Sequence, residues 1–160
     1  NHRKSNNAPY LTGSGARRTV GSGLERLINS IDGNTQEVYK QYRIGGNINK
    51  VIQGAKNIVK WKKELKSKTP FVFFQFLVVK PNEHQIKEIK KLAEEVGVDE
   101  VRFKTAQVYD YESDPNQLIP SNEKFSSYNK SKDSTTIYKI KLSNHCWKLR
   151  LANVKKWEGL

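Results

Sequence analysis

The sequence predicts an α/β protein in which parallel strands alternate with helices. Near-continuous apolar runs indicate strands that are buried on both faces, and apolar stripes at helical spacing lie between these runs. The connections are short, and the order strand, helix, strand, helix, strand is typical of a parallel array. A chain of 160 residues with 36% apolar residues is long enough for one domain with a real core.

The first strand is predicted at residues 27–31, where a short apolar run ends at Asp32-Gly33. This dipeptide favours a turn, because Gly tolerates positive φ and Asp can bond its own backbone. Ser30 and Asp32 are two residues apart and therefore share one strand face. The polar residues after the turn indicate a helix that reaches Arg43. Small polar groups thus gather at the carboxyl end of a strand, where α/β sheets and barrels place their ligands.

A helix is predicted at residues 47–66, because Asn47 can cap it and its apolar residues recur at helical spacing. Its lysines are interpreted as a solvated outer face. The second strand, at 71–79, is apolar almost throughout, which predicts burial on both faces. Gln75 interrupts this run. Its amide is either satisfied by the backbone or faces a ligand, and the sequence leaves both interpretations open.

A second helix is predicted at 82–96, with Asn82 as its cap, and a third strand comes next at 98–105. Arg102 and Lys104 share one face of that strand. Right-handed crossovers place both helices on one side of the parallel strands. The polar positions of the three strands then all lie on the opposite side, which we expect to be polar and net basic.

The two ends of the chain carry weaker patterns. Glycines lower the helix propensity of residues 1–23, so only a short helix at 16–20 is expected there. After the third strand the pattern becomes irregular, with a short strand at 136–142. We therefore divide the chain into an α/β unit at 1–105 and an extended tail at 106–160.

Charge and cysteine content limit the partners. Lys and Arg number 29 against 16 Asp and Glu, a net charge of +13. The cations are scattered along the chain, with one dense run at 60–68, which disfavours nucleic acid as the partner. Cys146 is the single cysteine, so the chain alone cannot build an intramolecular disulfide or a multi-cysteine metal site, and a reducing, cytoplasmic setting fits best. The apolar run at 71–79 is too short to span a membrane as a helix. GxSxG, P-loop and GxGxxG patterns are absent, so standard hydrolase, nucleotide triphosphatase and dinucleotide-binding interpretations lack support.

Several segments resemble radical SAM enzymes that carry a SPASM-type C-terminal extension. The resemblance covers most of residues 6–149 and implies that the strands are the carboxyl-terminal half of a (β/α)6 partial TIM-like barrel. The segments that carry it are Ser30-Ile31-Asp32-Gly33, Tyr39, Tyr42-Arg43, Gly45-Gly46, Val51 and Gly54-Ala55 for the fourth strand and its helix, 71–82 for the fifth strand, 101–105 for the sixth, and Asn144-His145-Cys146-Trp147 for the SPASM lead.

The resemblance also implies cofactors and site residues. S-adenosylmethionine and a [4Fe–4S] cluster are the cofactors of the parent family, and its substrate is a peptide or a small molecule. By this likeness Ser30 and Arg43 lie at S-adenosylmethionine, with Asp32 as a weaker candidate, and Cys146 takes the position of the first auxiliary-cluster cysteine. Gln75, from the strand pattern, completes the candidate cofactor-binding set.

The departures from the family matter as much as the likeness. The CxxxCxxC loop that holds the cluster and the Gly-Gly-Glu segment that binds the methionine amine are absent here. We therefore expect this chain alone to hold neither cofactor firmly and to be inactive. Without strands one and two of the barrel, we also expect an unpaired edge on the first strand, marginal stability and self-association through that edge.

Two alternatives stay open. The first is a basic α/β nucleic-acid-binding module, which rests on the net charge and on Tyr109, Tyr111 and Trp61 as aromatic side chains for base stacking. The second is a scaffold or assembly piece without chemistry, for which self-association would be the sign.

Overall fold

The computed structural model describes residues 3–5, 11–108, 114, 117–130, 137–139 and 147–150. One sheet has the strand order β1-β2-β3-β4-β7, and β5 and β6 form a second, two-stranded sheet. The elements in chain order are β1 (Arg3–Ser5), α1 (Gly13–Gly21), β2 (Arg26–Ser30), α2 (Gln36–Tyr42), α3 (Ile48–Glu64), β3 (Phe71–Val78), η1 (Glu83–Gln85), α4 (Ile86–Val96), β4 (Glu100–Thr105), η2 (Glu123–Phe125), β5 (Tyr128–Lys130), β6 (Ile137–Lys139) and β7 (Trp147–Arg150).

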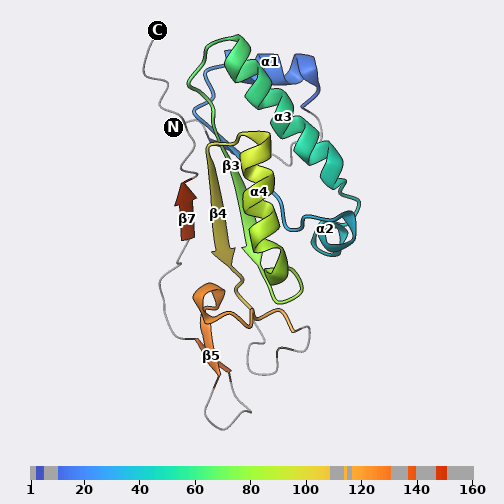
Figure 1. Ribbon diagram of the computed structural model, residues 1–160, viewed down its shortest axis with the longest axis vertical. Helices are drawn as coiled ribbons and strands as arrows, with labels where there is room; N and C mark the ends of the chain where they lie inside the picture. The colour runs from blue at the N-terminus through green and yellow to red at the C-terminus, as the bar shows by residue number, and fades with distance from the viewer. Residues whose placement is uncertain are drawn as a thin grey trace.

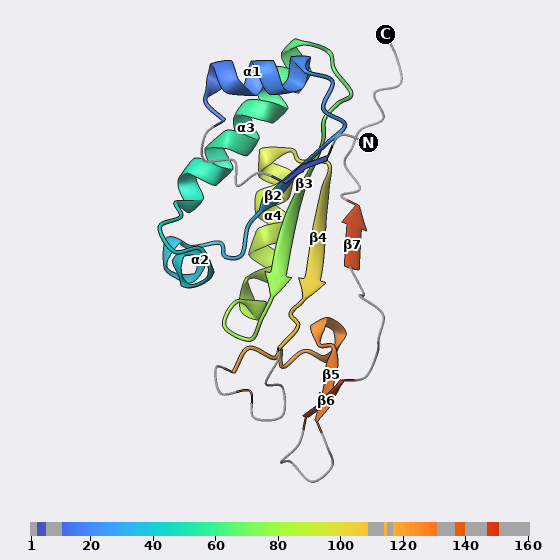
Figure 2. The ribbon, with the colours of Figure 1, turned by 180° about the vertical axis from the view of Figure 1, so that it is seen from behind.

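The predicted parallel array is present. Strands β2, β3 and β4 are adjacent and parallel, which confirms the α/β fold class expected from the sequence. Helix α4 lies in front of the strands in Figure 1 and behind them in Figure 2, and α3 lies on the same side. Both helices therefore cover one face of the sheet, as right-handed crossovers require. Over the ranges described, none of the helices has both the length and the apolar character to cross a bilayer.

The helix-covered face carries the core. Alternate residues of each strand point to this face, because successive side chains of a strand lie on opposite sides. Phe76 and Phe103 meet here with ring centroids 5.9 Å apart. The buried strand residues that share one cluster with α1, α3 and α4 are Leu27, Ile31, Val72, Phe74, Phe76, Val78, Val101 and Phe103. The predicted apolar, helix-covered face of the strands is thus confirmed.

The helix boundaries reflect local capping. Asn47 caps α3 as predicted, since its Oδ1 accepts a hydrogen bond from Lys50 N at 3.0 Å. Helix α2 is capped by Thr35, whose hydroxyl accepts from Val38 N at 3.4 Å. Gly97 ends α4 with φ of 81°, a left-handed conformation that favours glycine.

The expected open edge on β2 is wrong. Strand β1 pairs in parallel with β2, with Arg3 opposite Arg26 and Ser5 opposite Ile28. This strand has three residues and no apolar alternation, so the hydrophobic pattern on which the other strands were recognised does not extend to it. The short helix expected at 16–20 is present as the longer α1.

The segment after β4 contains more pairing than the sequence suggested. The strand expected at 136–142 is present as β6, which pairs antiparallel with β5. Strand β7 returns to the main sheet and pairs antiparallel with β4. Phe125 also joins the main core, with its ring centroid 5.7 Å from that of Phe103. Part of residues 106–160 therefore packs with the α/β unit.

Candidate functional site

Three predicted polar positions form one row on the face of the sheet that the helices leave uncovered, here called the open face. Ser30 lies beside Gln75 in the strand register, and Gln75 lies beside Arg102. Neighbouring strands are about 4.8 Å apart, so the row spans about 10 Å. Ser30 is buried, and the other two are half-buried. The shared face is as predicted, while the role of these residues in ligand binding stays a prediction.

Asp32 is a centre of hydrogen bonding at the carboxyl end of β2. Its Oδ2 accepts from Arg43 Nε at 2.7 Å, and its Oδ1 accepts from Leu77 N at 3.2 Å. The Asp32 side chain is 7% exposed, against 32% for that of Arg43. The carboxylate thus ties β2 to β3 and fixes the guanidinium. Asp32 therefore positions Arg43, and its direct contact with a ligand stays a prediction.

Arg43 keeps binding capacity in this arrangement. Its Nε is taken by Asp32, whereas its two terminal nitrogens have no hydrogen-bond partner within the described residues. A guanidinium held in this way can still receive an anion through charge-assisted hydrogen bonds.

Helix α2 approaches the Asp32 turn at two glycines. A Cβ on Gly33 would lie 2.6 Å from Tyr39 N, and one on Gly46 would lie 2.7 Å from Tyr39 Cε1. The sequence pattern suggested positive φ at Gly33, but Gly33 is not among the residues with that conformation. Its role is to allow the backbone of α2 to come close. Both glycines therefore hold Tyr39 beside the ion pair.

The two tyrosines of α2 respond to this environment. Burial raises the pKa of Tyr39; the nearby Arg43 guanidinium lowers that pKa, and the Asp32 carboxylate raises it. Burial also raises the pKa of Tyr42, again with a contribution from Asp32. Both phenols are therefore neutral over the physiological range of pH.

Asn82 joins the ends of β2 and β3. This fully buried side chain donates from Nδ2 to Asp32 O at 3.1 Å and to Leu77 O at 2.8 Å. Its Oδ1 accepts from the backbone N–H three residues earlier at 2.8 Å. Gln85 Oε1 accepts from Asn34 N at 2.7 Å. The sequence assigned Asn82 to a helix cap, but the structure uses both amides to fasten the loop after β3 to the end of β2.

Sequence reasoning missed the partner of Arg102. The Arg102 Nε and Nη2 atoms donate to the two carboxylate oxygens of Glu100 at 2.7 and 3.2 Å. The Arg102 guanidinium carbon also lies 3.8 Å from the ring centroid of Phe73. Since residues two apart share a strand face, the spacing of Glu100 and Arg102 was an available signal. We expected this face to be net basic. At its centre this is wrong, because Glu100 neutralises the positive charge of Arg102.

The described residues do not fit an iron–sulfur cluster. Across these ranges, no three His, Cys, Asp or Glu side chains come together as metal ligands. A [4Fe–4S] cluster is held by thiolates. Cys146, the one cysteine, lies outside the described residues.

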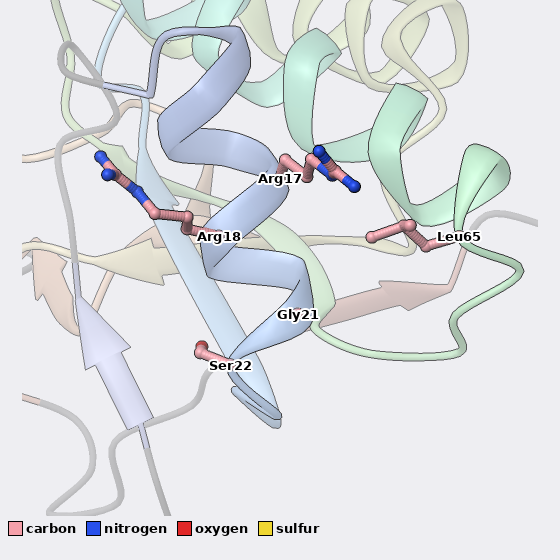
Figure 3. Close-up of a pocket in the computed structure, with 5 residues that line it drawn as sticks. All are labelled: Arg17, Arg18, Gly21, Ser22 and Leu65. Atoms are coloured by element: carbon pink, nitrogen blue, oxygen red, sulfur yellow. The ribbon is translucent and has the colours of Figure 1, made fainter.

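An open hollow of about 500 Å³ lies at the opposite end of the sheet (Figure 3). It forms where α1 and α3 end, shortly before β2 and β3 begin. Arg17 and Arg18 point to different sides of α1. None of the predicted cofactor-binding residues lines this hollow, whose lining residues are Arg17, Arg18, Gly21, Ser22 and Leu65.

Comparisons with known proteins give limited information. No family model matches the sequence, and no curated protein matches it. Two similar solved structures are TYW1 with a lysine-pyruvate adduct bound, with a TM-score of 0.46, and archaeal TYW1, with a TM-score of 0.42. Each is 16% identical over 84% of this chain, which spans only 45% and 44% of their lengths. TYW1 is a radical SAM enzyme, but likenesses with TM-scores this low are too weak to assign a function.

Proposed function

We propose that this chain is the carboxyl-terminal half of a radical SAM barrel and that its strand ends bind the amino-acid part of S-adenosylmethionine. The observation that carries the proposal is the Asp32–Arg43 pair. A buried carboxylate fixes a partly exposed guanidinium at the carboxyl end of a parallel strand. In α/β sheets this end is where ligands bind.

The neighbouring residues suit the same ligand. The terminal nitrogens of Arg43 would take the methionine carboxylate, because two parallel N–H···O bonds match that geometry. Ser30 and Gln75 supply a hydroxyl and an amide side by side on the open face. These groups can hydrogen-bond the ribose hydroxyls. The ligand would thus extend from the strand ends onto the open face.

The proposed role of this chain is binding and not radical chemistry. The described residues lack a thiolate set for the cluster, so no step is assigned to it. A SPASM-type continuation with Cys146 at the auxiliary-cluster position, a peptide or small-molecule substrate and the inactivity of the isolated chain are parts of the same proposal.

The experiment is a titration of ¹⁵N-labelled protein with S-adenosylmethionine, monitored by NMR. We expect shifts of the Ser30, Asp32, Arg43 and Gln75 amides, with a Kd weaker than about 10 μM, or about −7 kcal/mol. Arg43→Gln should abolish these shifts. Arg43→Lys should weaken them, since Lys keeps the positive charge but cannot form two parallel hydrogen bonds with a carboxylate.

Lys91→Gln is the matched control, because Lys91 lies on the exposed side of α4. Shifts that persist in Arg43→Gln, or the absence of shifts in the unsubstituted protein at millimolar ligand, would refute the binding proposal. Binding tighter than about 10 μM would show that the site is complete and refute the half-barrel proposal. Formation of a stoichiometric [4Fe–4S] cluster after addition of iron and sulfide would also refute the half-barrel proposal.

A further inference from the structure

The helices on the covered face of the sheet differ in surface charge. Helix α4 carries three lysines and three glutamates, and Lys91 Nζ lies 4.0 Å from Glu95 Oε1. Residues 48–68, which comprise α3 and the turn after it, contain one acidic residue, Glu64. Their seven lysines are Lys50, Lys56, Lys60, Lys62, Lys63, Lys66 and Lys68. The positive charge of the helical layer is therefore concentrated on α3 and the turn after it.

Three of these lysines form a stripe along α3. At 100° per residue, Lys56, Lys60 and Lys63 lie within about 60° of one another around the helix axis. All three are exposed, and none takes part in an ion pair within the described residues. Lys62 differs, because its Nζ lies 2.7 Å from Asp99 Oδ2 and serves the fold.

This arrangement costs the helix stability. Like charges four residues apart destabilise a helix, and Lys56 and Lys60 have that spacing. Lys50 lies in the first turn of α3, where the helix dipole disfavours a cation, and no acidic residue lies there. Lys50, Lys56 and Lys60 therefore oppose local helix preferences, whereas Lys62 and Lys63 suit the last turn of α3.

Helix α1 extends the positive surface. It packs against α3, and the Arg17 guanidinium carbon lies 5.4 Å from the ring centroid of Trp61. Figure 3 shows Arg17 on the side of α1 that faces α3. The exposed residues here called the α1–α3 basic surface are Arg17, Lys56, Lys60, Lys63, Lys66 and Lys68.

We infer that the α1–α3 basic surface binds the phosphate backbone of a nucleic acid without reading its bases. Clustered cations bind phosphates by releasing condensed counterions, which needs no base contact. Trp61, which the sequence suggested for base stacking, is half-buried under Arg17, so it is not a free platform. Tyr109 and Tyr111 lie outside the described residues.

A membrane surface fits these residues less well. A helix that lies on a bilayer presents a broad apolar face together with its basic residues. The exposed side of α3 presents lysines, and Leu65, which is 41% exposed, lies at the end of the helix as an isolated apolar side chain. This surface is also separate from Arg43 and Ser30, so its test is independent of the proposed S-adenosylmethionine site.

The experiment measures binding of a fluorescein-labelled 20-nucleotide oligo(dT) by anisotropy over a range of salt concentrations. Lys56→Glu/Lys60→Glu should weaken binding about tenfold or more and flatten the slope of log K against log salt by about 1.4, or about 0.7 for each phosphate contact. The matched control is Lys87→Glu/Lys91→Glu on α4, which changes the net charge by the same amount. We expect the control to change binding less than about threefold, through the long-range field alone.

The outcomes separate the possibilities. Equal weakening by both double variants would show that net charge alone acts and would overturn the inference. Salt-independent or undetectable binding by the unsubstituted protein would overturn it too, as would binding to phosphatidylserine vesicles in preference to the oligonucleotide. Circular dichroism melting checks the fold. If a charge-reversed variant fails to fold, the corresponding Lys→Gln pairs on α3 and α4 provide the same comparison.

Discussion

The two faces of the sheet are stabilised by different interactions. The covered face buries aliphatic and aromatic side chains such as Phe76 against helices. The open face buries Glu100 and part of Arg102 as an ion pair stacked on Phe73. Asn29 is a polar exception on the covered face, whereas the open face combines its polar groups with apolar side chains such as Phe71, Phe73 and Leu77. Apolar packing thus supports the fold, while paired polar groups keep the other face available for a ligand.

Phe76→Ala should have the largest effect, because Phe76 is fully buried on the covered face. Loss of a buried Phe side chain costs about 3–5 kcal/mol through lost transfer energy and the cavity left behind. The adjacent Gln75→Ala, on the open face, should cost less than about 1 kcal/mol. Urea unfolding of both variants measures the difference. Similar losses would contradict the contrast between the faces.

Arg102→Ala should come next, with a loss of about 3 kcal/mol, because it leaves the buried Glu100 carboxylate without its partner. The double variant Glu100→Gln/Arg102→Ala should recover part of this loss, since it removes the unpaired charge. A double-mutant cycle on thermal unfolding tests the coupling. Additive losses would show that the pair does not hold the open face. Lys104→Ala, an exposed position on the same strand, is the control.

Asn29→Leu should stabilise the protein by about 1–2 kcal/mol, because both polar atoms of the buried Asn29 amide lack partners among the described residues. Asn82→Leu is the matched control and should act in the opposite direction. Asn82 is equally buried, but its amide makes three hydrogen bonds. Denaturant midpoints give both values. A loss of stability in Asn29→Leu would show that its amide is satisfied in solution.

The smallest effect concerns Tyr39, whose folded-state pKa is raised by burial above the usual 10.0. The unfolded chain then loses this proton first. The contribution to stability is complete below about pH 10 and is lost as the pH rises through the folded-state pKa. Tyr39→Phe should flatten the fall in stability above about pH 10, while Tyr42 retains its share. An identical alkaline profile in the variant would contradict this assignment.

The sequence predicted the strands and helices whose burial depends on local periodicity. The apolar run at 71–79 and the spacing at 47–66 were sufficient for β3 and α3, because each pattern covers many residues. Strand β1 and the return of β7 to β4 were not predicted, since short strands are defined by partners far away in the chain. The start of α3 at its Asn47 cap was recovered, whereas the predicted cap at Asn82 is not formed.

The candidate site was predicted only in part. Period-two alternation brought Ser30, Gln75 and Arg102 to one face. The same alternation places Asn29 between Leu27 and Ile31 on the covered face, so its burial could also have been foreseen. The contact of Arg43 with Asp32 depends on the orientation of α2, which no local pattern specifies.

The hydrogen bonds that Asn82 makes with the ends of β2 and β3 have a consequence for ligand entropy. An unrestrained arginine side chain loses up to about 2 kcal/mol of rotamer freedom when it is fixed. Here Asn82 holds the Asp32 backbone, and the Asp32 carboxylate already orients Arg43. Much of that rotamer loss therefore occurs during folding and not during binding, so an anion would meet a preorganised guanidinium.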